Sequence, residues 1–448
     1  MNGRSLNRVA AFFVDLMQRF MPDPFLFAAV LTFLTFAVAI GVAQDGAAAV
    51  LSAWADGVFR LLPFAMQMVL ILVTGHALAN APSVKRVLGW IGSRPRTPGQ
   101  AVVTVFAAAA AGSLLNWGFG LVVGAILARQ VGARVRRADF GFLVAAAYAG
   151  FIVWESGLSS SIALISATPG SPMNFAERIG GEVLPLHATL LSPLNLIPVA
   201  LTLLLMPLAF LFMQPSEEAV VPAPVEPDAA RSAEPDESWT PARRLEEATS
   251  VSAGLAALVL AGLTARVAGG GPVDINAVIL LMLGLGLLAH RTPMRYVHAV
   301  NEAARTVGPL LIQYPLYGGI QGMLEQSGAA ALLSGFFVDL SNRESLPFWS
   351  YVASCLLNFF VPSGGGHWVV QGPIVAEAAR ALHASQAATA MGVAFGDQVA
   401  NMVQPFWALP LLAVAGIPVR RIMGYCVIAF AVGFVVFGAA LWVFPGGA

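Results

Sequence analysis

The stretch that decides the fold is "SLLNWGFG", Ser113 to Gly120, which interrupts a long apolar run covering residues 99–129. Basic residues gather on both sides of this run, at 85–96 and at 129–137. The positive-inside rule places both groups in the cytoplasm, which a single crossing helix does not allow. A hairpin that enters and leaves the membrane on the same side does allow it. Asparagine and glycine suit the turn, and non-helical backbone is tolerated at membrane depth where protein or a watery cavity surrounds it. The sequence therefore predicts a re-entrant hairpin near 99–129.

The composition indicates a membrane protein. Hydrophobic residues make up 58% of the 448 residues, charged residues 11%, and the mean hydropathy is +0.76. A soluble domain carries roughly 25% charged residues. The length allows about nine to ten crossings of roughly 20 residues each. The formal net charge is zero, so no nucleic-acid partner is expected. The positions of the basic loops predict a multi-pass protein with a cytoplasmic N-terminus.

Residues 214–249 are rich in proline, alanine and glutamate and have no hydrophobic period. Such a composition is typical of a disordered segment, here a cytoplasmic linker. It divides the chain into an N-terminal half, 1–213, and a C-terminal half, 250–448.

The two halves resemble each other. "AAGSLLNWGFGLVVGAI" at 110–126 matches "VASCLLNFFVPSGGGHWVVQGPI" at 352–374, which predicts a second hairpin near 347–378. Downstream, "YAGFIVWESGLSSS" matches "GVAFGDQVANMVQP", each a polar break in an apolar run. The second hairpin follows a connection expected outside, so the halves are inverted copies. We expect an all-α polytopic membrane protein with an inverted repeat, about nine to ten transmembrane helices, two opposed re-entrant hairpins and broken helices. This pattern is typical of secondary transporters.

Several longer motifs carry a family resemblance: "MPDPFLFAAVLTFLTF", "FAMQMVLILVTGHALA", "NWGFGLVVGAI", "VPSGGGHWVVQGP" and "MVQPFWALPLLAVAGI". Over nearly the whole chain the sequence resembles the bacterial short-chain fatty acid transporter family, which includes acetoacetate- and butyrate-type permeases. The resemblance implies a transporter of small monocarboxylates in the bacterial inner membrane. It also implies kinship with a wider ion-transporter superfamily with two opposed hairpins, whose members often dimerise, so a homodimer is an open possibility. Glu155 stands where the family pattern leads us to expect glycine, which argues against a functional role for it.

A short-chain carboxylate needs hydrogen-bond donors and a positive potential, and the apolar runs offer no obvious Arg or Lys. Backbone N–H groups at the starts of half-helices are the alternative. His76 and His367 are further candidates, as proton carriers or carboxylate donors. The predicted substrate-binding residues are His76, Asn116, Trp117, Gly118 and Gly120 in the first half, and Asn358, Ser363, Gly364, Gly365, Gly366, His367 and Gln371 in the second.

Asp397 is the most suggestive acid because it lies in an apolar run beside Gln398 and Asn401. A carboxylate with amide neighbours at a helix break can coordinate Na⁺, here at Asp397 and Asn401, or carry a proton. The corresponding stretch of the first half has the hydroxyl groups of Ser159, Ser160 and Ser161. These residues are the predicted ion-coupling set; the choice between Na⁺ and H⁺ stays open, and no other cofactor is expected.

Three functions compete at this point. The leading one is a cation-coupled symporter of short-chain monocarboxylates. A transporter of another small organic anion, such as a dicarboxylate, would use the same fold but want a second strong donor set. A channel would not require two matched hairpins. A membrane enzyme should show a nucleophile–base pair or a metal constellation, so we expect no enzyme.

Overall fold

The structure is a computed structural model in which every regular element of the described residues is a helix. The described residues are 12–16, 19, 23–43, 46–60, 62–171, 173–224, 240–271, 275–305, 307–362 and 364–447. The predicted all-α architecture of a polytopic membrane protein is confirmed. Within these residues, seven segments are long and apolar enough to cross a membrane: Phe25–Val42, Gly46–Leu78, Pro98–Leu115, Phe140–Ser166, Pro193–Phe212, Thr249–Ala268 and Met423–Val443.

The first half consists of α-helices, one 3₁₀-helix and one π-helix. In chain order they are α2 (Pro24–Val42), α3 (Gly46–Arg60), α4 (Leu62–Asn80), α5 (Pro82–Gly92), α6 (Pro98–Leu115), α7 (Trp117–Arg134), α8 (Phe140–Ala149), the 3₁₀-helix η1 (Gly150–Ser156), α9 (Ser161–Ser166), the π-helix η2 (Ala176–Gly180) and α10 (Pro193–Phe212).

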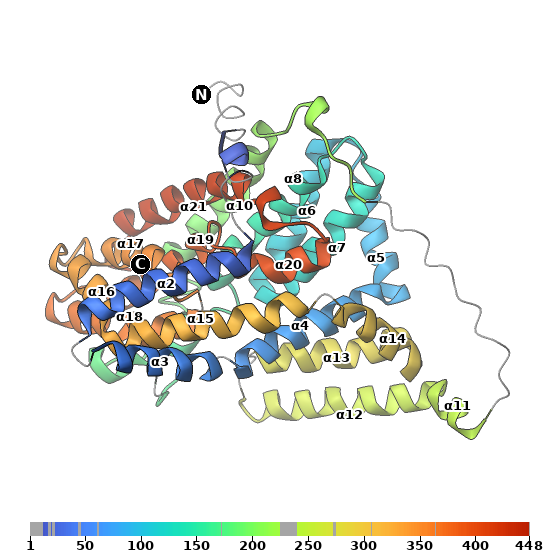
Figure 1. The fold of residues 1–448 in the computed structure, drawn as a ribbon, viewed down its shortest axis with the longest axis horizontal. Coiled ribbons are helices and arrows are strands. Elements are labelled where there is room, and N and C mark those ends of the chain that lie inside the picture. The colour runs from blue at the N-terminus through green and yellow to red at the C-terminus, as the bar shows by residue number, and fades with distance from the viewer. Residues whose placement is uncertain are drawn as a thin grey trace.

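The remaining elements begin in the connection between the halves. They are η3 (Glu217–Ala219), α11 (Pro241–Glu246), α12 (Thr249–Ala268), α13 (Ile275–His290), α14 (Pro293–Ala304), α15 (Gly308–Ser327), α16 (Ala329–Asp339), α17 (Leu346–Leu357), α18 (Gly364–Ala381), α19 (Gln386–Ala400), α20 (Ala408–Ala415), η4 (Val419–Arg421) and α21 (Met423–Val443). Figure 1 shows α6–α8 and α16–α18 toward opposite ends of the molecule, with α2 and α15 running between them.

Helices α6 and α7 form an antiparallel hairpin around Asn116. The turn is tight because the two helices touch through glycines: a β-carbon on Gly112 would lie 2.8 Å from Cα of Gly120. Farther from the turn, a β-carbon on Gly124 would lie 3.0 Å from that of Ala109. Glycine thus permits a backbone approach that a larger residue would block. The turn falls within the predicted "SLLNWGFG" stretch; its depth in the bilayer, and so the re-entrant character, stays a prediction.

Helices α17 and α18 form a second antiparallel pair. Nε2 of Gln371 on α18 donates to the carbonyl oxygen of Ser350 on α17 at 2.9 Å. Nearer the turn, His367 meets Ser354, with 3.1 Å between Nε2 and Oγ. The order of helix, Leu-Leu-Asn turn and helix is therefore the same in both halves.

Each hairpin is followed by a helix that stops among buried residues. In the first half, α8 tightens into η1 and ends at Gly157, where a β-carbon would lie 2.4 Å from the carbonyl oxygen of Leu114. In the second half, α19 ends at Asn401 and the chain turns before α20. Both breaks were predicted from the polar residues within apolar runs.

Large apolar side chains cover the outside of several helices. Phe33 on α2, Leu204 on α10, Leu258 on α12 and Val435 on α21 are each more than half exposed. Exposed apolar surface of this extent is unusual for a soluble protein and suits contact with lipid. A large apolar cavity of about 770 Å³ also lies between α4, α5, α6, α7 and α13.

The segment predicted as a disordered linker has structure at its described ends. Val221 pairs with Phe140, whose N–H donates to the Val221 carbonyl at 2.9 Å. The N–H of Val221 donates to Oδ2 of Asp139 at 2.9 Å, and Nη1 of Arg136 donates to the carbonyl of Ala223 at 3.0 Å. Residues 214–224 are therefore attached to the first half by these hydrogen bonds. The prediction of disorder covered 214–249; its described parts contain η3 and α11, and residues 225–239 lie outside the described residues.

Candidate functional site

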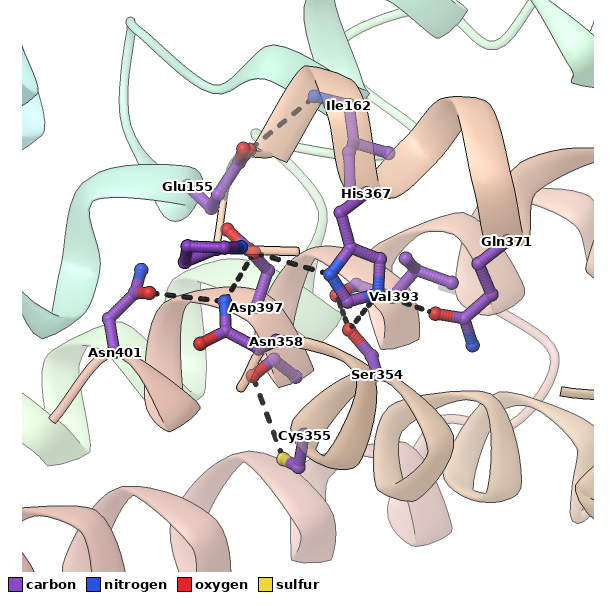
Figure 2. Close-up of polar contacts among 12 residues, drawn as sticks. Glu155, Ile162, Ser354, Cys355, Asn358, His367, Gln371, Val393, Asp397 and Asn401 are labelled. Atoms are coloured by element: carbon purple, nitrogen blue, oxygen red, sulfur yellow. Dashed lines mark hydrogen bonds and ion pairs between the residues drawn. The ribbon is translucent and has the colours of Figure 1, made fainter. Parts of the chain in front are cut away.

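A buried polar centre lies where α17, α18 and α19 meet (Figure 2). Its middle is Asp397 on α19, which is fully buried. Nδ2 of Asn358, at the end of α17, donates to Oδ1 of Asp397 at 2.6 Å and lies 3.1 Å from Oδ1 of Asn401. The structure thus brings together one predicted substrate-binding residue and two predicted ion-coupling residues.

His367 joins the centre with a defined hydrogen-bond pattern. Gln371 donates to Ser350, so its Oε1 faces His367, 2.7 Å from Nε2. Oγ of Ser354 donates to the carbonyl of Val393 at 2.7 Å, so it can only accept from Nε2. Since both neighbours are acceptors, Nε2 carries a hydrogen atom.

The other ring nitrogen of His367 faces Asp397. Nδ1 lies 3.4 Å from Oδ1 of Asp397, and both side chains are fully buried. A proton on Nδ1 would make this contact an ion pair, whereas a lone pair there would face the carboxylate unfavourably. His367 therefore connects Asp397 to Ser354 and Gln371 through its two ring nitrogens.

Glu155 was not among the predicted site residues, yet the structure places it beside the centre. It is fully buried at the end of η1. Its Oε2 accepts from Oγ of Ser160 at 2.6 Å and from the N–H of Ile162 at 3.4 Å. Its Oε1 points at α18, so that a β-carbon on Gly364 would lie only 2.2 Å away. The carboxylate therefore lies beside the first turn of α18, where the helix dipole favours negative charge.

The two broken helices are also hydrogen-bonded to each other. Oγ of Ser156 and the amide of Gln398 exchange two contacts, at 3.2 and 3.0 Å. Nδ2 of Asn195 on α10 donates to the carbonyl of Ser156 at 3.0 Å. A further bond joins α8 to the end of α19: the hydroxyl of Tyr148 donates to the carbonyl of Asn401 at 2.6 Å. The residues next to Glu155 and Asp397 thus tie the first half to the second.

The tip of the first hairpin is occupied by its own side chain. Oδ1 of Asn116 accepts from the N–H groups of Gly118 at 2.9 Å and Phe119 at 3.2 Å, which caps α7. The N–H of Trp117 donates to Oγ of Ser159 at 3.0 Å. These donors already have protein acceptors, so the first tip offers an anion fewer free N–H groups than the sequence led us to expect. Gly120 packs against Ser113 within the hairpin.

The tip of the second hairpin is more open. Gly364, Gly365 and Gly366 form the first turn of α18, and a β-carbon on Gly365 would meet no atom within 4 Å. N–H groups in the first turn of a helix have no acceptor within the helix. Gly366 faces the amide of Gln321 on α15. Ser363, also predicted for substrate, lies outside the described residues.

The predicted serines converge on Glu155 and the first tip. Ser160 donates to Glu155 and accepts from the N–H of Ala163, which caps α9. Oγ of Ser161 lies 3.1 Å from the position that a β-carbon on Gly364 would take. His76 stands apart: it is on α4, beside Gly75, which packs on Val122 and Met282.

Glu155 and Ser354 are the site residues that the sequence predictions omitted. One signal could have found Glu155. It follows Asn116 by 39 residues, and Asp397 follows Asn358 by the same 39. The repeat therefore places the two acids at corresponding positions, each followed by a residue that hydrogen-bonds across the halves.

The sequence was compared with those of protein families and of curated proteins. The profile of the family described as "Short chain fatty acid transporter" matches residues 5–444. A relative from Escherichia coli K12 is 41% identical over 443 residues, which cover 98% of this chain and 100% of the relative. A relative from Haemophilus influenzae is 38% identical over 431 residues, covering 95% and 96%. The names of both assign them, provisionally, to short-chain fatty acid transport.

Two solved structures are similar at lower identity. The YdaH transporter of Alcanivorax borkumensis is 14% identical with a TM-score of 0.48, covering 95% of this chain and 100% of that one. MtrF of Neisseria gonorrhoeae, described with a class of antimetabolite efflux pumps, is 14% identical with a TM-score of 0.42, covering 96% and 97%.

Proposed function

The chain belongs to the short-chain fatty acid transporter family, and we propose that it is a secondary active transporter of short-chain monocarboxylates, such as acetoacetate or butyrate, driven by symport of Na⁺ or H⁺. We place this transporter in the bacterial inner membrane. The protein is a carrier and not an enzyme, in keeping with its family.

The observation that carries the proposal is the buried polar centre around Asp397. Ionisable side chains inside a membrane protein are costly, and they commonly mark ion or substrate pathways. Here Asp397 is fully buried with His367 and Asn358 in contact, inside a chain of mean hydropathy +0.76. Replacing a buried ion pair by well-packed apolar residues is often neutral or stabilising, so fold stability alone does not require such a centre.

The centre explains why transport of an anion would depend on a cation. Within the described residues, the hydrogen bonds and ion pairs of Asp397 involve no Lys or Arg side chain. A bound Na⁺ or H⁺ would neutralise the carboxylate and let a second carboxylate, that of the substrate, approach. An amide donor is near, because Nδ2 of Asn401, whose Oδ1 lies 3.1 Å from Nδ2 of Asn358, is buried without a hydrogen-bond acceptor in this part of the chain. Cation and substrate would therefore bind together.

The two hairpins suit an alternating-access mechanism. We infer that the halves are inverted repeats and that the second tip, Gly364–Gly366, donates backbone N–H groups to the substrate carboxylate. His367 and Gln371 already hydrogen-bond to protein groups, so we assign them to supporting the tip and not to contact with the substrate. Movement of the hairpin-bearing region would then expose the centre to either side. A homodimer and a cytoplasmic N-terminus are parts of the same proposal.

Uptake into proteoliposomes tests the proposal. The purified protein is reconstituted and labelled acetoacetate, butyrate or succinate is offered under an imposed Na⁺ gradient or an imposed pH gradient. Accumulation of the monocarboxylates above the external concentration under one of the gradients is expected. Accumulation of succinate alone would favour the dicarboxylate alternative. Equilibration without accumulation would indicate a channel, and no uptake under either gradient would overturn the proposal.

A further inference from the structure

Glu155 and Asp397 occupy corresponding places in the two halves. Each follows the asparagine of a Leu-Leu-Asn turn by 39 residues, and each lies at the end of a broken helix. Their neighbours in sequence, Ser156 and Gln398, hydrogen-bond to each other. The two acids therefore face a common space from opposite halves. In Figure 2 the carboxylate of Asp397 lies between Glu155 and His367.

Each carboxylate has one oxygen that the protein leaves unpaired. Oε1 of Glu155 and Oδ2 of Asp397 are buried and make no hydrogen bond among the described residues, and the same is true of Oδ1 of Asn358. The second oxygen of each acid is held by protein donors: Ser160 and Ile162 for Glu155, and Asn358 for Asp397. Leaving a buried acceptor unpaired costs about 1–3 kcal/mol, more for a charged group.

The start of α18 offers Glu155 only the partial positive charge of a helix end, and among the described residues no Lys or Arg side chain pairs with either acid. His367 contacts Oδ1 of Asp397, on the side away from the unpaired oxygen, and can supply at most one charge. Asp397 and Glu155 stand next to Gln398 and Ser156, which hydrogen-bond to each other, so negative charges on both acids would repel. Two buried carboxylates with one imidazole partner therefore leave a net negative site in a medium where unpaired charge is expensive.

Taken together, the geometry points to a single Na⁺ held between Glu155 and Asp397, with ligands from both halves of the chain. Oxygen ligands suit hard cations, and neutral oxygens commonly complete such sites. Oγ of Ser161 is such an oxygen near Glu155, since both lie around the position that a β-carbon on Gly364 would take. Among the described residues no group of three His, Cys, Asp or Glu side chains forms a metal site, so a transition metal is not the occupant we infer.

This inference rests on the proposed symport and makes it more specific. It assigns the coupling ion and adds Glu155, a residue of the first half, as a ligand. A cation that binds to both broken helices would hold the two halves together while it is bound. Gly364 is part of the same arrangement, because its missing side chain lets Glu155 approach the start of α18.

The test is binding of ²²Na⁺ to the purified full-length protein at constant ionic strength, with choline replacing Na⁺. We expect saturable binding of one ion per chain. Glu155→Gln and Asp397→Asn should each weaken binding of the single ion at least tenfold. Two ions per chain, with one of them still bound at the original affinity in each variant, would indicate two separate sites and overturn the shared one. Glu377→Gln and Asp339→Asn, at exposed positions on α18 and α16, are the matched controls and should bind like the unaltered protein.

Two further measurements distinguish failure of the sodium site from failure of the proposed transport function. Glu155→Asp retains a carboxylate with shorter reach, so it should bind Na⁺ more weakly than the parent and more tightly than Glu155→Gln; size-exclusion elution shows whether each variant is folded. Uptake of labelled butyrate under a pH gradient is measured on the same preparations. Uptake driven by pH alone, with no Na⁺ binding, would overturn the sodium site and leave the proposed transport intact. Sodium binding unchanged by Glu155→Gln would remove Glu155 from the site, and binding of Ca²⁺ that Na⁺ does not displace would equally overturn the inference.

Discussion

Oε1 of Glu155 occupies the space that a side chain on Gly364 would need, since a β-carbon there would lie 2.2 Å from it. Glu155 ends the broken helix of the first half and Gly364 begins α18 in the second. This contact, together with the hydrogen bonds between Ser156 and Gln398, brings the two halves together at the polar centre.

Substituting Gly364→Ala should displace Glu155 or the start of α18. Overpacking of this kind costs about 1–3 kcal/mol. We expect a lower unfolding temperature and at least a tenfold loss of butyrate uptake, measured on the purified and reconstituted protein. The neighbouring Gly365→Ala is the control, because a β-carbon there meets open space. If both variants behaved alike, the close approach of Glu155 would have no consequence.

Asp397→Asn should abolish gradient-driven accumulation while the protein stays folded. Asparagine keeps the size of the side chain and an acceptor for Nδ2 of Asn358, but it removes the charge that the cation would neutralise. Accumulation of labelled acetoacetate should fall to the level of empty liposomes, with an unchanged size-exclusion profile. Asp339→Asn, at an exposed position on α16, should accumulate substrate normally. Unchanged accumulation by Asp397→Asn would exclude Asp397 from coupling.

His367→Phe should destabilise the protein more than His367→Gln does. Phenylalanine leaves the buried Oε1 of Gln371 without the donor at 2.7 Å, whereas glutamine retains an N–H group that can reach it. A buried acceptor left unpaired costs about 1–3 kcal/mol. Thermal unfolding of the two variants in the same detergent gives the comparison. A larger loss for His367→Gln would contradict the assigned hydrogen bonds.

Asp139→Ala should loosen the segment that leaves the first half. Asp139 caps α8 through Phe142, accepts from Val221, and lies 3.5 Å from Arg421. Loss of the cap alone costs about 1 kcal/mol. Limited proteolysis should cut near residues 214–224 faster in this variant, and Asp139→Asn, which retains one side-chain acceptor, should lie between the two. Equal cutting rates would show that the cap does not hold this segment.

The sequence predicted the helical hairpins better than it predicted their chemistry. Charge on both sides of 99–129 and the glycines within it located the turn in the stretch Ser113–Gly120, where the structure has it at Asn116, because these signals are local. The partners of the tip residues are not local. Asn116 uses its side chain to cap α7, which competes with any ligand for the N–H groups of Gly118 and Phe119. Nothing in the spacing of these residues distinguishes N–H groups that are free to bind an anion from N–H groups that a side chain already caps.

Glu155 shows why the rest of the site was missed. The resemblance led us to expect glycine at this position, so its carboxylate was set aside. Its role depends on a contact with Gly364, more than two hundred residues away in sequence. Only the equal spacing of the acids in the two halves could have indicated it from the sequence. In the same way, the pairing of Val221 with Phe140 gave structure to the start of a segment whose composition indicated disorder.

The glycine contacts between α6 and α7 have a mechanical consequence. With Gly112 against Gly120 and Gly124 against Ala109, the two backbones are in direct contact and cannot approach each other further without steric collision. If the pair moved as one unit, the chain would bend at its ends, before Thr97 and after Arg134, where the helices begin and stop. Force applied at Asn116 would be transmitted along the full length of both helices to those ends.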